Sequence, residues 1–169
     1  GIAGGADVIL VPEIEWTLEG VLRKIRQREE TGRHFSIVIV AEGARWPNGG
    51  LVARATGEGQ IGEIRLGGIG QQLAHEIQER SRREARYVVL GHLQRGGGPT
   101  TFDRLLATRF GVNAVRLVVE NRFGRMVSYQ PPDILDVPIT QAIHQLRRVP
   151  PNGDLVRTAR ALGISFGDG

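Results

Sequence analysis

Residues 6–41 decide the fold class; they read ADVILVPEIEWTLEGVLRKIRQREETGRHFSIVIVA. The stretch starts with an apolar run at 6–11, which Pro12 closes, and ends with a second apolar run at 36–41. Short apolar runs bounded by turn residues are typical of strands that are covered on both faces. Between the runs, Thr17 is a candidate N-cap, and apolar residues then recur at helical spacing until Thr31-Gly32. Strand, helix and strand with short connections predict a βαβ unit in a parallel sheet.

The rest of the chain adds further helices and strands around this unit. Residues 43–63 are rich in glycine and polar residues and are expected to form a surface excursion. Leu66 to Gly70 leads into a predicted helix that carries Leu73 and Ile77. Strands are predicted at 86–91, 126–129 and 134–137, and helices at 99–110, 112–119, 140–146 and 155–162, with Gly111 separating two of the helices. The last residues, ISFGDG, are expected to be frayed. The predicted fold class is α/β, a three-layer sandwich with a mainly parallel sheet.

The composition excludes several classes of protein. The chain of 169 residues is 40% apolar and 24% charged, which fits a folded globular protein. It has no run of the roughly 20 apolar residues that a membrane-spanning helix needs. It has no cysteine, so disulfides and thiolate metal sites are excluded and a cytoplasmic location is expected. The net charge of +4 comes almost entirely from arginine, but acidic residues are interspersed and aromatic residues are not interleaved, so no nucleic-acid partner is expected.

The most informative segment for function is GHLQRGGGP at residues 91–99. It follows a predicted strand and precedes a predicted helix, and ligands of open α/β sheets bind at that end of the strands. His92 and Arg95 place two potential hydrogen-bond donors three residues apart, and the glycines let backbone amides approach a ligand. The helix N-terminus that follows would favour an anion. The segment is therefore either a site for a phosphate or similar anion, or a glycine-rich turn with incidental polar residues.

Two further residues are candidates on weaker grounds. Glu42 lies at the carboxyl end of the 36–41 run, where it either accepts hydrogen bonds from sugar hydroxyls or simply caps a turn. Arg86 either faces the same side as His92, if 86–92 is extended, or is one more surface arginine of the cluster at residues 80–86. Gly4 to Asp7 is either a phosphate or metal contact or a tight turn. No metal-binding motif or Walker-type phosphate loop is present.

The segment GHLQRGGGPTTFDRLLATRFG at 91–111 resembles the phosphofructokinase family, in which GHxQRGGxPxxxDRxLAxxxG is a specific pattern. GIAGGADVILVPE at 1–13, IVIVAEG at 37–43 and ARYVVLGH at 85–92 resemble the same family in order and spacing. The resemblance extends to about residue 162 and is strongest with the bacterial branch of ATP-dependent and mixed ATP/pyrophosphate-using members.

The resemblance implies specific roles for the candidates. Glu42 matches the glutamate that binds hydroxyls of fructose 6-phosphate, and His92 and Arg95 match the pair that holds its 6-phosphate. Arg86 matches the arginine that reaches the sugar phosphate in a neighbouring subunit. In allosteric members the region of Gly5 to Asp7 contacts an effector nucleotide together with basic residues at the positions of Thr31 and Arg33; the threonine puts this regulation in question.

The resemblance also implies an architecture and partners. Residues 1–94 would form the fructose 6-phosphate-binding domain, 95–143 the C-terminal portion of the nucleotide-binding domain, and 144–169 a return to the substrate domain with a tail. The glycine-rich nucleotide loop and the acidic segment that supplies the catalytic base and the Mg²⁺ ligands are expected upstream of this chain, so it holds no catalytic residue and no metal ligand. The implied protein is a cytoplasmic homodimer or homotetramer that uses ATP or pyrophosphate. The alternative interpretation is an inactive sugar-phosphate-binding module or a truncated gene product.

Overall fold

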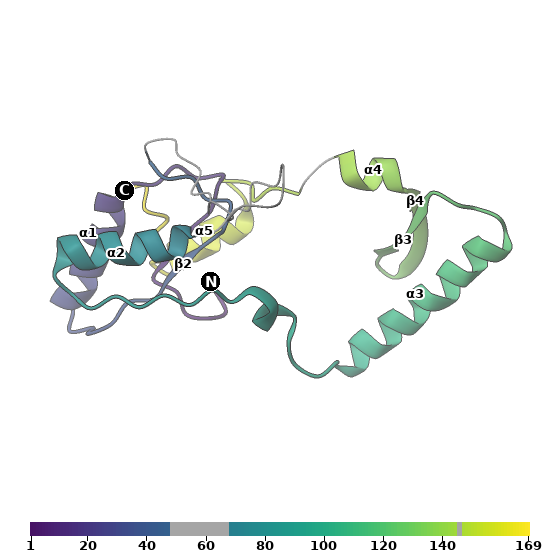
Figure 1. The fold of residues 1–169 in the computed structure, drawn as a ribbon, viewed down its shortest axis with the longest axis horizontal. Helices are drawn as coiled ribbons and strands as arrows, with labels where there is room; N and C mark the ends of the chain where they lie inside the picture. Colours follow the sequence, from purple (N-terminus) through teal and green to yellow (C-terminus); the bar gives the residue numbers. More distant parts are fainter. Residues whose placement is uncertain (48–67, 145–146) are drawn as a thin grey trace, which may run out of the picture. The chain divides into compact units, whose positions relative to one another are not determined.

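The computed structural model describes residues 1–47, 68–144 and 147–169. The chain divides into two compact units: unit 1 comprises Gly1–Val89 and Arg148–Gly169, and unit 2 comprises Leu90–Arg147 (Figure 1). Most of the excursion predicted at 43–63 lies outside the described residues. No helix in the described ranges is long and apolar enough to cross a membrane.

The predicted βαβ unit is present at the start of unit 1. Strands β1 (Val8–Leu10) and β2 (Val38–Val40) pair in parallel, and α1 (Leu18–Glu30) connects them. Thr17 is the N-cap of α1, because its side-chain oxygen accepts a hydrogen bond from the backbone N–H of Gly20 at 3.0 Å. The boundaries of α1 therefore confirm the sequence prediction at both ends, and only the strands are shorter than expected.

Unit 1 has three layers, with the sheet between helices. Val8 and Leu10 of β1 belong to a buried cluster with residues of α1 and of α2 (Ile69–Ser81). Ile9, which alternates with them along the strand, packs against a second buried cluster that includes Val156 and Ala159 of α5 (Asp154–Ala161). Since successive side chains of a strand point to opposite faces, one strand builds both clusters. The predicted α/β fold with helices on both sides of a parallel sheet is confirmed here.

The C-terminal segment is ordered against the sheet, so the prediction of a frayed end was wrong. Ser165 forms a parallel bridge with Val8, beside β1. Ile164 and Phe166, on either side of it, are buried in the cluster beneath α5. The prediction took the segment as polar, whereas its two large apolar side chains and the edge of β1 determine its place.

Unit 2 contains the 3₁₀ helix η1 (Gly91–Arg95), one long α-helix, a hairpin and a short α-helix. Helix α3 (Thr101–Val119) packs on the antiparallel hairpin of β3 (Arg125–Gln130) and β4 (Asp133–Pro138), and α4 (Ile139–His144) follows. The hairpin confirms the two strands predicted around Pro131-Pro132. The predicted break at Gly111 was wrong, because α3 is continuous through it. A single helical glycine costs only about 1 kcal/mol relative to alanine, which its apolar neighbours in α3 outweigh.

The strand predicted at 86–91 does not form. Residues 84–90 belong to no helix or strand, and Val88 and Val89 are 75% and 71% exposed. A strand is stable only when a neighbour pairs with its backbone, and no described residue pairs with this run. The apolar run at 86–91 has the composition of a strand, but composition does not show whether a neighbouring strand is available to pair with it.

Candidate functional site

The glycine-rich segment forms a short 3₁₀ helix, η1 (Gly91–Arg95), which carries two of the predicted site residues. Hydrogen bonds from Leu93 N–H to Leu90 O (2.8 Å) and from Gly96 N–H to Leu93 O (3.1 Å) close its turns. A 3₁₀ helix has three residues per turn, so side chains three positions apart lie above one another. Ideal geometry would therefore place His92 and Arg95 on the same side of η1. Both are exposed, which leaves their donors accessible to a ligand.

The glycines after Arg95, Gly96 to Gly98, connect η1 to α3. Gly97 has φ +96°, a left-handed conformation that a side chain would strain. A Cβ at Gly97 or Gly98 would meet no atom within 4 Å, so the backbone of this segment stands open. The segment thus combines two cationic or donor side chains with an uncovered glycine backbone, an arrangement that suits an anionic group.

The N-terminus of α3 is already occupied by a carboxylate of the chain itself. The Thr100 side chain accepts from Asp103 N–H at 3.2 Å, and the Asp103 carboxylate accepts from Thr100 N–H at 2.8 Å, which completes a capping box. The hydrogen bonds from the Thr100 side chain and backbone lower the pKa of Asp103, so that it is charged at neutral pH. The helix terminus that the sequence suggested as an anion site therefore holds its own anion, and His92 and Arg95 are the better donors.

Glu42 lies in a turn directly after β2. Ala41 N–H donates to Leu10 O at 2.9 Å, and Ala44 N–H donates to Ala41 O at 2.9 Å, so both ends of the turn are fixed by the backbone. The Glu42 side chain is exposed. Its carboxylate therefore stands at the carboxyl edge of the parallel sheet, available as an acceptor for hydroxyl groups.

Arg86 is an exposed arginine in the irregular segment after α2. Its side chain is 84% exposed and pairs with Glu84 at 2.7 Å. Other members of the arginine cluster are paired in the same way: Arg80 with Glu76 and Arg83 with Glu29, each at 3.2 Å. Local carboxylates thus compensate three of these guanidinium charges, and the cluster is a mixed-charge surface.

The structure brings together only part of the predicted site. His92 and Arg95 lie in unit 2 and share one short helix, whereas Glu42 and Arg86 lie in unit 1. The hypothesis that Arg86 and His92 share a strand face does not hold, because no strand contains them. Each unit thus presents its own candidate residues.

Asp7 has a structural role that the sequence did not reveal. The Gly4 to Asp7 run was considered as a phosphate or metal contact, but the Asp7 carboxylate is buried, pairs with Arg28 at 2.7 Å and accepts from Ile37 N–H at 2.8 Å. It therefore links the end of α1 to the entry of both strands. The sequence did not predict this role, because the spacing between Asp7 and Arg28 does not show that the two side chains pair.

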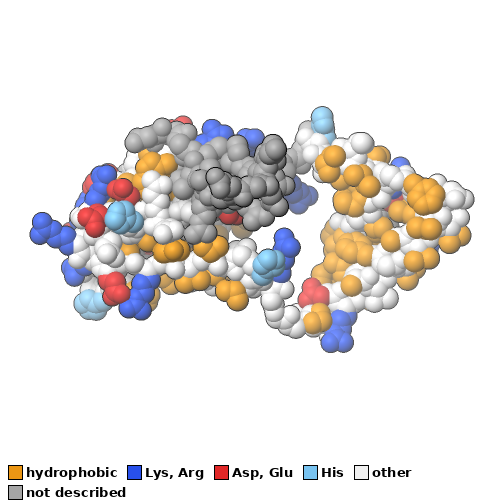
Figure 2. Space-filling view, in the orientation of Figure 1, with side chains coloured by type: hydrophobic (Ala, Val, Ile, Leu, Met, Phe, Trp, Pro, Cys, Tyr) orange, Lys and Arg blue, Asp and Glu red, His pale blue; other side chains and the backbone are white. Residues whose placement is uncertain are grey.

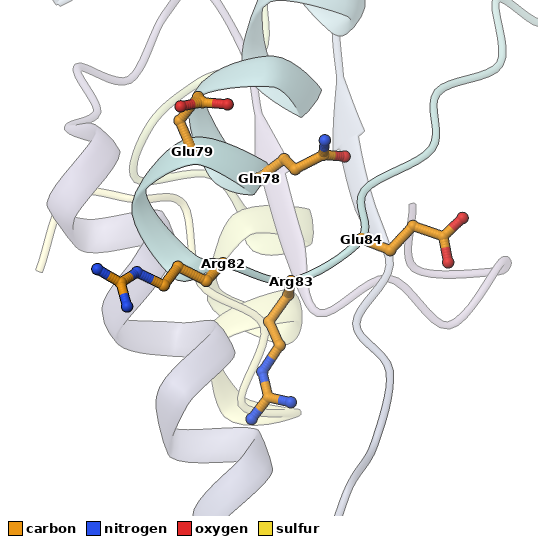
Figure 3. A pocket seen from close by; sticks show the side chains of 5 residues that line it. All are labelled: Gln78, Glu79, Arg82, Arg83 and Glu84. Carbon is orange, nitrogen blue, oxygen red and sulfur yellow. The ribbon is translucent and has the colours of Figure 1, made fainter.

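A shallow surface depression lies at the end of α2 and is not part of the predicted site. Gln78, Glu79, Arg82, Arg83 and Glu84 line it, and in Figure 3 the arginine side chains point away from Glu84. Its mixed charges favour no ligand class. The described part of the chain also contains no group of three or more His, Cys, Asp or Glu side chains that could hold a metal ion.

Comparison with known proteins assigns the sequence to a family. A sequence model described as phosphofructokinase matches residues 1–118. The chain belongs to the phosphofructokinase family. Residues 91–118, which include η1 and most of α3, thus lie inside the matched family region.

Curated relatives of this phosphofructokinase chain include enzymes with either phosphoryl donor in their names. An ATP-dependent 6-phosphofructokinase of Chloroflexus aurantiacus is 49% identical over 168 residues, covering 99% of this chain and 45% of the relative. A pyrophosphate–fructose 6-phosphate 1-phosphotransferase of Amycolatopsis methanolica is 49% identical over 152 residues, covering 89% of this chain and 44% of the relative. The chain spans less than half the length of these relatives.

Solved structures agree on the fold. A pyrophosphate-dependent phosphofructokinase from Nitrosospira multiformis superposes with a TM-score of 0.63 at 21% identity, covering 94% of this chain and 40% of that one. One from Marinobacter aquaeolei superposes with a TM-score of 0.65 at 17% identity, covering 95% and 41%. At these identities the likeness establishes the fold alone.

Proposed function

We propose that this chain is the sugar-phosphate-binding part of a 6-phosphofructokinase, which transfers a phosphoryl group from ATP or pyrophosphate to the 1-hydroxyl of fructose 6-phosphate. The observation that carries the proposal is that His92 and Arg95 lie, exposed and three residues apart, on one short helix inside the segment that the family shares. Relatives named for either donor match this chain at 49% identity, over 168 and 152 residues, so the donor is left as either one.

The two donors would hold the 6-phosphate of the sugar. Arg95 offers a planar guanidinium that matches phosphate oxygens in pairs, and His92 adds a second donor one turn away. Glu42 would accept hydrogen bonds from the sugar hydroxyls. In phosphoryl transfer the protein contributes chiefly by positioning the reactants and by stabilising charge, so these residues act by fixing the sugar rather than by moving its proton.

Arg86 would reach a sugar phosphate bound in a neighbouring subunit of a homodimer or homotetramer. Its pairing with Glu84 is no obstacle, because an exposed ion pair is worth only about 0–1 kcal/mol and a phosphate is the stronger acceptor. Arg86 would therefore be free to exchange Glu84 for the sugar phosphate of a neighbouring subunit.

The domain assignment follows from the same proposal. Residues 1–94 would be the fructose 6-phosphate-binding domain, residues 95–143 would belong to the nucleotide-binding domain, and residues 144–169 would return to the substrate domain. The described residues do not fit a Mg²⁺ site, since no cluster of carboxylates is present among them. The metal that accompanies ATP, and the catalytic base, would therefore belong to another part of the enzyme, which would work in the cytoplasm.

Unit 2 offers a surface for that other part. Leu105, Val112, Val115 and Val119 line the side of α3 opposite to the hairpin and are 56–75% exposed. A helix that is apolar on both sides is normally covered on both. Together with the length of the relatives, this surface supports the view that unit 2 completes its core with residues outside this chain.

The proposal is tested in a fusion of this chain to the preceding part of the Chloroflexus aurantiacus relative. Arg95→Ala is expected to weaken fructose 6-phosphate binding by about 1.5–3 kcal/mol, the range for a hydrogen bond to a charged group. Arg23→Ala, which removes an exposed arginine of α1, serves as the control and leaves the affinity unchanged. An unchanged affinity in the Arg95 variant would contradict the assignment.

A second candidate, a sugar-phosphate-binding module without catalysis, follows from the share of the relatives that the chain covers, 45%. On the chain alone, turnover does not distinguish the candidates, but binding does. ADP release measures turnover, which both candidates predict to be absent without the other part. Titration with fructose 6-phosphate measures binding, and saturable binding by the chain alone favours the module.

A further inference from the structure

Glu42 is carried by a turn whose two ends are held in different ways. At its start, Ala41 N–H donates to Leu10 O at 2.9 Å, so the backbone of β1 holds that end. At its close, Ala44 N–H donates to Ala41 O at 2.9 Å, and Ala44 is buried. Glu42 itself is exposed. The position of its carboxylate therefore depends on what holds the chain from Ala44 onward.

A pair of tryptophans holds the chain after this turn. The rings of Trp46 and Trp16 meet edge to face, with centroids 5.2 Å apart and an interplanar angle of 89°. This geometry is favoured because the positive edge of one ring meets the negative face of the other. Trp16 is 4% exposed and belongs to the buried cluster that also contains Ala44, and the partly buried Trp46 packs against this cluster. Since Ala44 contributes only a methyl group, Trp46 is the larger apolar anchor of the turn.

This anchor lies in the core of unit 1. The cluster around Trp16 draws on β1, α1 and α2, and it includes Val8, Val21 and Leu73. Close packing leaves a large buried side chain little freedom, so Trp46 lies against a fixed partner. A hydroxyl reaches its acceptor only over about 2.5–3.0 Å and at a favourable angle. The Glu42 carboxylate therefore needs a fixed turn to meet the hydroxyls of a sugar.

We propose that Trp46 is a positioning residue for Glu42: its ring, held edge to face by Trp16, fixes the turn that presents the carboxylate to the sugar hydroxyls. The inference rests on the role proposed for Glu42 above. Trp46 acts through the backbone of the turn and not on the sugar itself. Removal of its ring leaves the carboxylate charge in place but lets the carboxylate occupy a wider range of positions, so the affinity for the sugar falls.

The first test measures KM and kcat for fructose 6-phosphate in the fusion of this chain to the preceding part of the Chloroflexus aurantiacus relative. Trp46→Leu is expected to raise KM about fivefold, the factor that corresponds to one edge-to-face aromatic pair. Trp46→Phe keeps a ring at this position and is expected to change KM by less than about twofold.

The control for the first test is Ile25→Ala, because Ile25 packs against the same cluster from α1. It is expected to lower the melting temperature and to leave KM unchanged, since loss of folded enzyme lowers the apparent kcat and not the affinity. An unchanged KM in Trp46→Leu, or an equal rise in Ile25→Ala, would overturn the proposal.

The second test repeats Trp46→Leu in the Glu42→Ala background. Glu42→Ala alone is expected to raise KM by about 10- to 150-fold, the factor for a lost hydrogen bond to a charged group. The further substitution is expected to change KM by less than about twofold, because there is no carboxylate left to position. A further fivefold rise would mean that Trp46 acts independently of Glu42 and would overturn the proposal. An unchanged KM in Glu42→Ala would overturn the role of Glu42 and this inference with it.

The third test needs no substrate, so it separates this inference from the proposed function. It measures amide hydrogen exchange in the same fusion. The Ala44 amide is expected to exchange about tenfold faster in Trp46→Leu than in Trp46→Phe, because the end of the turn has lost its ring. The Ala41 amide, which bonds to Leu10 O, is expected to keep its rate in both variants. Equal Ala44 rates in the two variants would overturn the proposal, whatever Glu42 binds.

Discussion

Units 1 and 2 differ in how much of their apolar surface they bury by themselves. In unit 1, β1 lies between two buried clusters, and Val8, Leu10 and Val21 are almost wholly inaccessible. In unit 2, Leu117 is the only buried apolar residue among those described, and Figure 2 shows apolar side chains spread over the surface of α3 and the hairpin. Regular secondary structure alone therefore does not make a core. Among the described residues, unit 1 buries a core of its own, whereas unit 2 leaves most of its large apolar side chains exposed.

The largest effect is expected from emptying the core of unit 1. Leu10→Ala is expected to cost about 2–5 kcal/mol of unfolding free energy, because Leu10 is 1% exposed and its removal leaves a cavity. Leu105→Ala, at an exposed site of α3, is expected to change it by less than about 0.5 kcal/mol. Both tryptophans, Trp16 and Trp46, lie in unit 1, so tryptophan fluorescence during urea unfolding measures the Leu10 variant, and the circular dichroism of helix α3 measures the Leu105 variant. Similar losses of unfolding free energy in the two variants would contradict the claim that unit 1 buries its apolar residues and unit 2 does not.

A smaller effect is expected from the helix caps, one in each unit. Thr17→Ala removes the cap of α1 and the contact of its hydroxyl with Gly167 O, and is expected to cost about 0.5–2 kcal/mol in the same urea experiment. Thr100→Ala removes the capping box of α3 and is expected to leave the fluorescence transition unchanged. Its effect is expected in circular dichroism, as a loss of helix signal at lower urea. A shift of the fluorescence transition in the Thr100 variant would mean that the units unfold together.

The smallest effect is expected from the ion pair at the end of unit 1. Hydrogen bonds from Arg160 lower the pKa of Asp168 below its ordinary value of 3.8. The folded state therefore binds this proton more weakly than the unfolded state, so the pair stabilises unit 1 above about pH 4 and the contribution disappears as the pH falls through the lowered pKa. Asp168→Asn is expected to cost at most about 1 kcal/mol at pH 7 and less at pH 2.5. A loss of the same size at both pH values would contradict this account.

The sequence predicted the elements of unit 1 well where local signals were strong. The Thr17 cap and the apolar spacing placed α1, and two short apolar runs placed β1 and β2. The sequence-based prediction failed where contacts between residues far apart in the chain determine the local structure. Ile164 and Phe166 become ordered because a strand edge receives them, and Val88 and Val89 stay irregular because no described strand does.

The candidate site was predictable in its residues but not in its local shape. The family motif identified Glu42, Arg86, His92 and Arg95, and their roles remain predictions. The motif predicted a turn after a strand, whereas the chain forms the 3₁₀ helix η1, which carries both His92 and Arg95. The capping of α3 by Asp103 was also unforeseen, because the Thr100 to Asp103 spacing was read as part of the motif and not as a capping box.

The most direct measurement is a crystal structure, with fructose 6-phosphate, of this chain fused to the preceding part of the Chloroflexus aurantiacus relative. The account predicts that oxygens of the 6-phosphate lie about 2.7–3.2 Å from nitrogen atoms of both His92 and Arg95. A phosphate bound elsewhere, with these two side chains directed away from it, would contradict the account.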